Sequence, residues 1–234
     1  PWSLTRSSES LTTMQEIEEL VQQTMSTARI PGLALAVIQG GEVLVSKGFG
    51  VANIETGNVV TSETMFQSGS LAKQFTSAGI MALIEDGRLE LDNSVRDYIV
   101  EAPISWQPIT IRHLLTHSSG IPDYTSDEFN YDVNYSEEDL VRMASTLEIE
   151  FEAGSRWSYS NTGYVMLGVI ISRVTGAPYW EFLRERIFDP SGMPTIRINT
   201  QDDVVPHRAQ GYLPIEGGWR HPAYIAPMTN TTAD

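Results

Sequence analysis

Ser70 and Lys73 are the first residues in this 234-residue sequence whose types and spacing could perform chemistry. They stand three residues apart in the stretch GSLAKQF, and the only other lysine of the chain is Lys47. In a helix, side chains at positions i and i+3 project from the same face. A lysine placed there can serve as the base or proton relay that turns a serine hydroxyl into a nucleophile. A capping serine followed by a solvated lysine would give the same pattern.

A second group with chemical potential is formed by Tyr159 and Asn161 in the stretch RWSYSNTGY. It precedes an apolar segment, in a turn where side chains can point into a cleft. A tyrosine beside a lysine can take the serine proton and return it to a leaving group. Asn161 can donate to a substrate carbonyl and accept from Lys73. Without a partner motif, a packed tyrosine and a helix-capping asparagine are the better explanation of these residues.

The hydrophobic pattern predicts mostly helices around these residues, after one N-terminal β-hairpin that turns at Gly40 and Gly41. The predicted helices are residues 12–29, 70–85, 110–117, 136–147, 162–176 and 178–187, and short β runs are expected within 196–219. The helix over 162–176 is apolar nearly all round, which indicates a buried helix. The first strand of the hairpin is apolar on both faces, so it needs cover on two sides and neighbouring strands at its edges.

Charge and composition exclude several classes of function. The formal net charge of -15 would repel nucleic acid and anionic lipid, which favours a small-molecule or peptide substrate. The absence of cysteine excludes disulfides and thiolate metal sites. No apolar run approaches the roughly 20 residues of a membrane span, and the N-terminus does not resemble a signal peptide. We therefore expect a soluble chain, either cytoplasmic or exported with its leader removed.

His113 and His117 raise the question of a metal site. They are spaced i, i+4, as two zinc ligands on a helix would be. The glutamate of an H-E-x-x-H motif is missing, and the leucines between the two histidines favour a structural pair. The chain also has no G-x-S-x-G nucleophile elbow and no phosphate-binding glycine loop. We expect neither a metal nor a cofactor.

Taken together and in this order, the two motifs resemble those of the penicillin-recognising serine hydrolases. The branch concerned contains class C β-lactamases, D-Ala-D-Ala carboxypeptidases and β-lactamase-like esterases. The segments that carry the likeness are residues 64–99, 109–124 and 151–176. The resemblance implies a fold of the α/β plus all-α class: an antiparallel sheet flanked by helices, with an inserted mostly helical domain and the active site between the two.

The resemblance also implies a role for each candidate residue. Ser70 would be the acylated nucleophile, with its backbone N–H as half of the oxyanion hole. Lys73 would be the proton relay, and Tyr159 the general base of acylation and the acid for the leaving group. Asn161 would position the substrate and orient the lysine. The implied activity is serine hydrolysis through an acyl-enzyme, on esters, amides, D-amino-acid peptides or β-lactams. The alternative is a penicillin-binding sensor or scaffold that is acylated but does not turn over.

Three regions are expected along the chain. Residues 1–62 would form the N-terminal helix and hairpin of the α/β domain, 63–190 the mostly helical domain with both motifs, and 191–234 a return toward the α/β domain. The family's third motif, Lys-Thr-Gly or His-X-Gly, does not follow Asn161. Because the hairpin also lacks partner strands, we expect an N-terminal fragment with an incomplete sheet. A C-terminal fragment of the same protein would complete it, and residues 1–234 alone would be inactive and poorly soluble.

Overall fold

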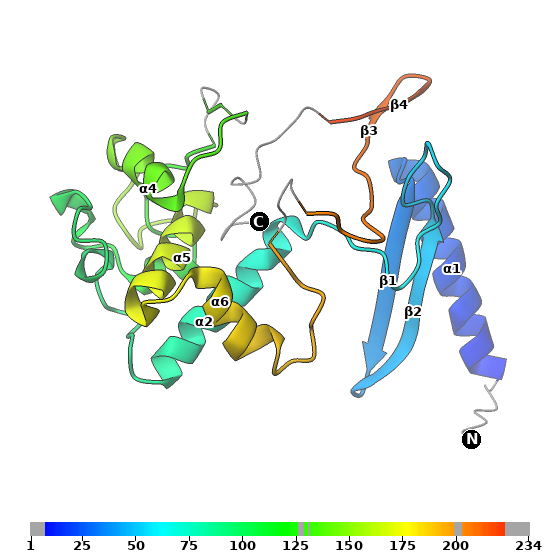
Figure 1. Ribbon diagram of the computed structural model, residues 1–234, viewed down its shortest axis with the longest axis horizontal. Coiled ribbons are helices and arrows are strands. Elements are labelled where there is room, and N and C mark those ends of the chain that lie inside the picture. The colour runs from blue at the N-terminus through cyan, green and yellow to red at the C-terminus, as the bar shows by residue number, and fades with distance from the viewer. Residues whose placement is uncertain (1–7, 126–128, 131, 199–202, 223–234) are drawn as a thin grey trace. The chain divides into compact units, whose positions relative to one another are not determined.

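The chain divides into two compact units. The computed structural model describes residues 8–125, 129–130, 132–198 and 203–222 (Figure 1). Within these residues, the first unit runs to Gln67 and resumes at Val204, and the second unit runs from Ser68 to Asp203. The sequence predicts divisions after residues 62 and 190. Both candidate motifs therefore lie in the second unit.

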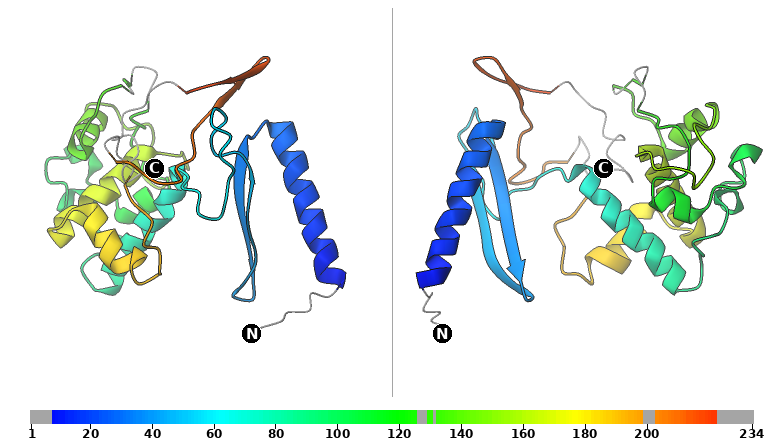
Figure 2. Two further views of the ribbon diagram at one scale, coloured as in Figure 1. Left: turned by 45° about the vertical axis from the view of Figure 1, so that its right-hand side comes forward. Right: turned by 180° about the vertical axis from the view of Figure 1, so that it is seen from behind.

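The first unit is built on a helix and a hairpin. Helix α1 (Ser8–Ala28) lies along one face of the antiparallel pair β1 (Gly32–Gln39) and β2 (Glu42–Gly50), as Figure 1 and Figure 2 show. The predicted turn is confirmed, and Gly40 and Gly41 have φ values of 60° and 83°, which favour glycine. A second hairpin joins β3 (Leu213–Ile215) to β4 (Gly218–Arg220), within the region where short β runs are predicted.

The core of the first unit lies between α1 and the hairpin. Val21 and Met25 of the helix bury their side chains there together with Phe49 of β2. Along β1, exposed and covered positions alternate, so the strand has one covered face. The exposed positions include Ala34 and Ala36. Among the described residues of the first unit, no element covers this apolar face of β1.

The second unit is mostly helical, as the sequence predicts. Its α-helices are α2 (Lys73–Glu85), α3 (Ile111–Leu115), α4 (Glu137–Ser145), α5 (Asn161–Thr175) and α6 (Tyr179–Leu183). Single 3₁₀ turns occupy Gly69–Ala72, Val95–Asp97 and Ile104–Trp106, and a π-helical turn spans Arg184–Phe188. Helix α5 packs against α2, α3, α4 and α6. Every residue of α5 from Thr162 to Ile171 is buried, which confirms the predicted buried helix.

Several helix boundaries differ from those predicted. The α-helix that follows the serine starts at Lys73, and Ser70 lies in the 3₁₀ turn before it. Helix α3 ends at Leu115, two residues before the predicted end. The helix predicted over 178–187 changes to a π turn after Leu183, and that turn carries Phe188, whose ring packs edge-on against a phenylalanine of α2. No helix in the described residues combines the length and apolar character that a bilayer crossing requires.

Gly120 supports the loop that follows α3, and its replacement has a predictable cost. Its φ is 74°, and a Cβ there would overlap the carbonyl oxygen of Phe151. Gly87 has a similar φ of 70° but nothing within 4 Å of its Cβ position. In urea unfolding, Gly120→Ala should lower the unfolding free energy by about 2–4 kcal/mol. Gly87→Ala should lower it by about 1–2 kcal/mol; equal losses would contradict the overlap at Gly120.

Candidate active site

Ser70 and Lys73 lie in contact at the start of α2. In a 3₁₀ turn the side chains at i and i+3 eclipse each other, and the turn Gly69–Ala72 brings this pair together. The Lys73 Nζ donates a hydrogen bond of 2.9 Å to the Ser70 Oγ. Ser70 is exposed, whereas the Lys73 side chain is 6% exposed. The hydroxyl therefore faces solvent while a buried ammonium lies beneath it.

Tyr159 completes the contact around the serine oxygen. Its Oη lies 2.6 Å from the Ser70 Oγ, although 89 residues separate the two in sequence. The Lys73 Nζ lies 5.1 Å from the centroid of the Tyr159 ring and 5.7 Å from that of Tyr164. Both distances are in the range of a cation–π interaction. The structure thus brings all three predicted catalytic side chains together.

Asn161 lies next to this cluster, at the first residue of α5. The cap of this helix is Ser160, whose hydroxyl accepts from the backbone N–H of Gly163 at 3.2 Å. The backbone N–H of Asn161 donates to the Asp123 Oδ2 at 2.5 Å. This bond fixes the entry into α5 directly after Tyr159. The contact between the Asn161 side chain and Lys73 stays a prediction.

His117 belongs to the cluster, and sequence reasoning missed this. Its ring lies 4.6 Å from the Tyr159 ring, centroid to centroid, and 5.1 Å from the Tyr164 ring. Its Nδ1 accepts from the backbone N–H of Ser160 at 3.1 Å. Burial and, second, the charge of Lys73 lower the pKa of His117, which favours the neutral imidazole. The sequence offers one signal for it: His117 lies in residues 109–124, the segment between the two motifs that also carries the likeness to the family.

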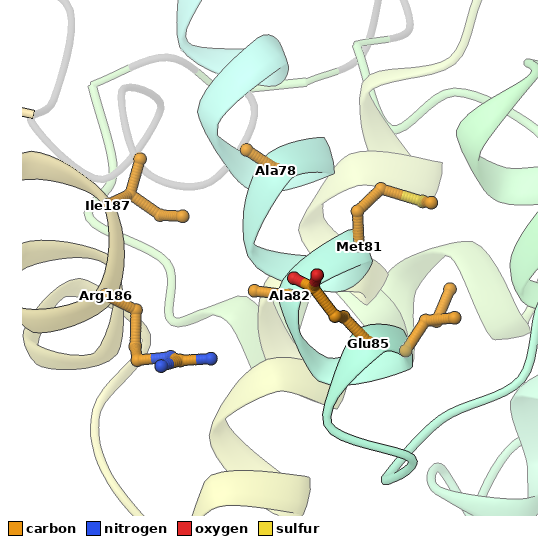
Figure 3. A pocket seen from close by; sticks show the side chains of 7 residues that line it. Ala78, Met81, Ala82, Glu85, Arg186 and Ile187 are labelled. Carbon is orange, nitrogen blue, oxygen red and sulfur yellow. The ribbon is translucent and has the colours of Figure 1, made fainter.

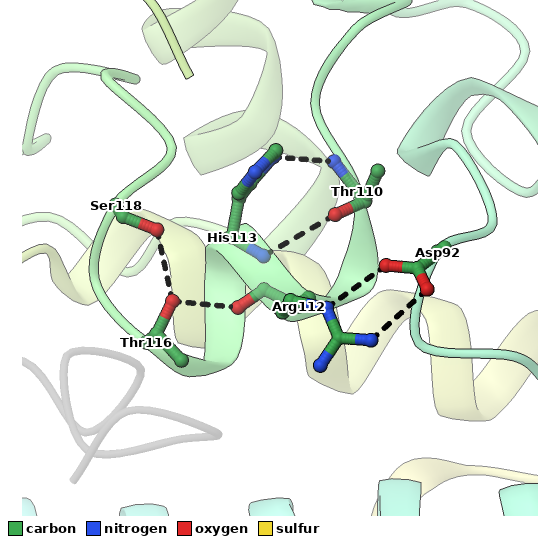
Figure 4. A network of polar contacts seen from close by, with 6 residues as sticks. All are labelled: Asp92, Thr110, Arg112, His113, Thr116 and Ser118. Carbon is green, nitrogen blue, oxygen red and sulfur yellow. Dashed lines mark hydrogen bonds and ion pairs between the residues drawn. The ribbon is translucent and has the colours of Figure 1, made fainter. Parts of the chain in front are cut away.

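His113 has a different and structural role (Figure 4). Its Nδ1 accepts from the Thr110 N–H at 3.2 Å, and its own N–H donates to the Thr110 hydroxyl. This reciprocal pair caps the N-terminus of α3. Because α3 ends before His117, the two histidines do not share a helix face. Among the residues that the structure describes, no three histidine or carboxylate side chains gather as metal ligands.

A hollow of about 700 Å³ lies elsewhere on the second unit (Figure 3). It is lined by α2 and by Arg186 and Ile187 of the π turn. The lining includes none of the three side chains around the Ser70 oxygen.

The contacts around the Ser70 hydroxyl suit it to act as a nucleophile. A serine hydroxyl in contact with both a lysine amine and a tyrosine hydroxyl can be deprotonated, can attack a carbonyl, and can later recover its proton. The family model described as Beta-lactamase matches residues 17–233. The chain therefore belongs to the β-lactamase family, a family of serine hydrolases, and has the β-lactamase fold. The described part of that fold is mostly helical, with two small sheets.

The proteins to which this chain is similar are longer than it is. Penicillin-binding protein 4* of Bacillus subtilis (strain 168) is 37% identical over 191 residues, which are 78% of this chain and 42% of the relative. The octameric penicillin-binding protein homologue from Pyrococcus abyssi is 31% identical, with a TM-score of 0.81 over 94% of this chain and 52% of that one. The D-amino acid amidase from Ochrobactrum anthropi is 28% identical, with a TM-score of 0.75 over 87% and 61%. The chain spans about half the length of the relatives it matches.

Proposed function

We propose that the protein is a serine hydrolase that forms an acyl-enzyme on Ser70. The observation that carries this proposal is the position of one oxygen. The Ser70 Oγ lies within hydrogen-bond distance of both the Lys73 Nζ and the Tyr159 Oη. A general base must lie within such a distance of the proton it removes.

In the proposed acylation, Tyr159 acts as the base and Lys73 supports it. Tyr159 would react as a phenolate, stabilised by the charge of Lys73. The Oγ of Ser70 attacks the substrate carbonyl carbon while its proton passes to this phenolate oxygen. The ammonium of Lys73 attracts the negative charge that develops on these oxygens. The tetrahedral intermediate collapses, the bond to the leaving group breaks, and Tyr159 returns the proton to that group. Ser70 then carries the acyl group as an ester.

Deacylation reverses the proton transfers. Tyr159 takes a proton from water, the hydroxide oxygen attacks the ester carbonyl, and the bond to the Ser70 Oγ breaks. The Oγ recovers the proton from Tyr159, and the acid product leaves. In both steps the Ser70 backbone N–H would hold the oxyanion, and the Asn161 side-chain amide would donate to the substrate carbonyl.

The proposed substrates are esters, amides and D-amino-acid peptides, with β-lactams as a further class. The names of the similar proteins support this range, since they include a D-amino acid amidase and penicillin-binding proteins. The aromatic side chains near the serine add a physical reason. Tyr159 is 41% exposed and Trp157, two residues earlier, is 66% exposed, so both can contact an apolar substrate group.

We further propose that a C-terminal fragment of the same protein completes the first unit and supplies the remaining strands of the family's sheet. Two observations support it: β1 and β2 form a sheet of two strands in the described part of the chain, and the relatives are about twice as long as this chain. Residues 1–234 alone should then show no turnover, and addition of a C-terminal fragment of the same protein should restore it. Full turnover by residues 1–234 alone would contradict this proposal.

A turnover measurement separates the hydrolase from the alternative, a sensor that is acylated only once. Similarity to penicillin-binding proteins is the observation that keeps this alternative open. With a chromogenic ester and a D-amino-acid anilide, the complete protein should release product steadily, well beyond one equivalent per Ser70. Release that stops at one equivalent would favour the sensor. No release and no Ser70 adduct would contradict both.

A further inference from the structure

His117 holds the short segment that carries Tyr159. Its backbone carbonyl accepts from the N–H of Ser158 at 2.8 Å. Its Nδ1 accepts from the N–H of Ser160 at 3.1 Å. These two bonds lie on either side of Tyr159 in the chain, so His117 fixes the backbone from which the tyrosine projects.

The His117 ring also supports the Tyr159 ring directly. The two rings lie 4.6 Å apart with an angle of 30° between their planes. The imidazole also contacts the ring of Tyr164, with 5.1 Å between the ring centroids and an angle of 35° between the planes. Tyr164 is held within the second unit, because its hydroxyl donates to the Leu115 carbonyl at 3.1 Å. The buried helix α5 thus supports Tyr159 through the imidazole.

We propose that neutral His117 is a positioning residue that keeps the Tyr159 hydroxyl on the Ser70 oxygen. This inference rests on the proposed function and deepens it. The Nδ1 can accept from the Ser160 N–H only while it carries a lone pair. Protonation would turn it into a donor that faces another donor, and the segment around Tyr159 would lose one of its two anchors.

The charges around His117 set the direction of the pH dependence. Lys73 of α2 opposes a charged imidazole, and Asp123 of the loop after α3 favours it. The rings that face the imidazole belong to Trp157, Tyr159 and Tyr164. Burial and Lys73 together outweigh the groups that favour the charged form, so the pKa of His117 lies below its ordinary value. Because the neutral form is the active one, activity should be present above this pKa and lost as the pH falls through it.

The test compares His117→Asn with His113→Asn in the complete protein. Asn tolerates positive φ, and residue 117 has a φ of 55°. Its side-chain oxygen can also accept where Nδ1 does, but it does not titrate. His113 is a matched control, since its Nδ1 also accepts from a backbone N–H and burial lowers its pKa as well. The readout is the rate of Ser70 labelling by a fluorophosphonate, measured by intact mass from about pH 4 to 8.

The wild type should lose labelling rate at acid pH, with a midpoint below that of an ordinary histidine. We call this fall in rate at acid pH the acid limb. His117→Asn should stay within about 10-fold of the wild-type rate at neutral pH and should lack the acid limb. His113→Asn should keep the limb. His117→Ala, which has no acceptor, should fall about 10–100-fold even at neutral pH, with folding checked by circular dichroism.

Two results would overturn the inference. An acid limb that persists in His117→Asn would assign it to another group, such as Asp123, and His117 would have no titrating role. A full labelling rate in folded His117→Ala would show that Tyr159 needs no such support. Both leave the proposed function intact, whereas a wild type without any Ser70-dependent adduct overturns the proposed function and this inference with it.

Discussion

Replacing Tyr159 with Phe should lower the rate of Ser70 acylation by about 10²–10⁴-fold, the contribution typical of a general base. The change removes only the hydroxyl that lies 2.6 Å from the Ser70 Oγ. The ring stays, and with it the stacking on His117 and the contact with Lys73. The measurement is the second-order rate constant for labelling by a fluorophosphonate, together with kcat/KM for a chromogenic ester.

Tyr164→Phe is the matched control for this prediction. The Tyr164 ring lies almost as close to the Lys73 Nζ, at 5.7 Å, but its hydroxyl bonds to the Leu115 carbonyl and to Ser77. The control should retain the acylation rate within about 10-fold and lose about 1 kcal/mol of stability. Equal losses of rate in the two variants would contradict the assignment of the base to Tyr159.

Lys73→Met is expected to have an effect of similar size, about 10³-fold on acylation. Methionine keeps a long unbranched side chain in a position that is 6% exposed, so packing changes little. The amine that donates to the Ser70 Oγ is lost. Because the charge that stabilises the developing negative charge is missing, raising the pH should restore the rate at most in part.

The other lysine of the chain provides the control. Lys47 pairs with Glu18 at 2.7 Å on the surface of the first unit, where both side chains are more than 40% exposed. Lys47→Met should leave acylation unchanged and alter stability by at most about 1 kcal/mol. If Lys73→Met retained the full rate, or if both variants lost it alike, the proposed support of Tyr159 by the charge of Lys73 would be contradicted.

Local pattern was sufficient to predict most elements of the fold. The β1–β2 hairpin follows from paired glycines between two apolar runs, and α5 from a segment that is apolar all round. The ends of the helices were less predictable. Ser70 lies in a 3₁₀ turn and Leu183 precedes a π turn, because tertiary packing decides how the first and last turns of a helix wind.

The candidate site was also predictable from the sequence only in part. Ser70 and Lys73 are neighbours through local spacing, but nothing local places Tyr159 beside them, and only the resemblance to a family joined the motifs. Sequence reasoning does not find His117, because its i, i+4 spacing from His113 predicts a helix that runs through residue 117. The helix ends at Leu115, and residue 117 has a φ of 55°, which turns the ring toward Tyr159 instead. A helical periodicity cannot anticipate a residue just beyond the helix.

Intact-mass spectrometry of the complete protein, before and after a fluorophosphonate, tests the central claim most directly. We expect one adduct per chain in the wild type and none in Ser70→Ala. Ser77→Ala is the matched control, since Ser77 lies seven residues further along, within α2, and its hydroxyl bonds to Tyr164; it should be labelled like the wild type. An adduct that persists in Ser70→Ala, or a wild type that is never labelled, would contradict the assignment of Ser70 as the activated nucleophile.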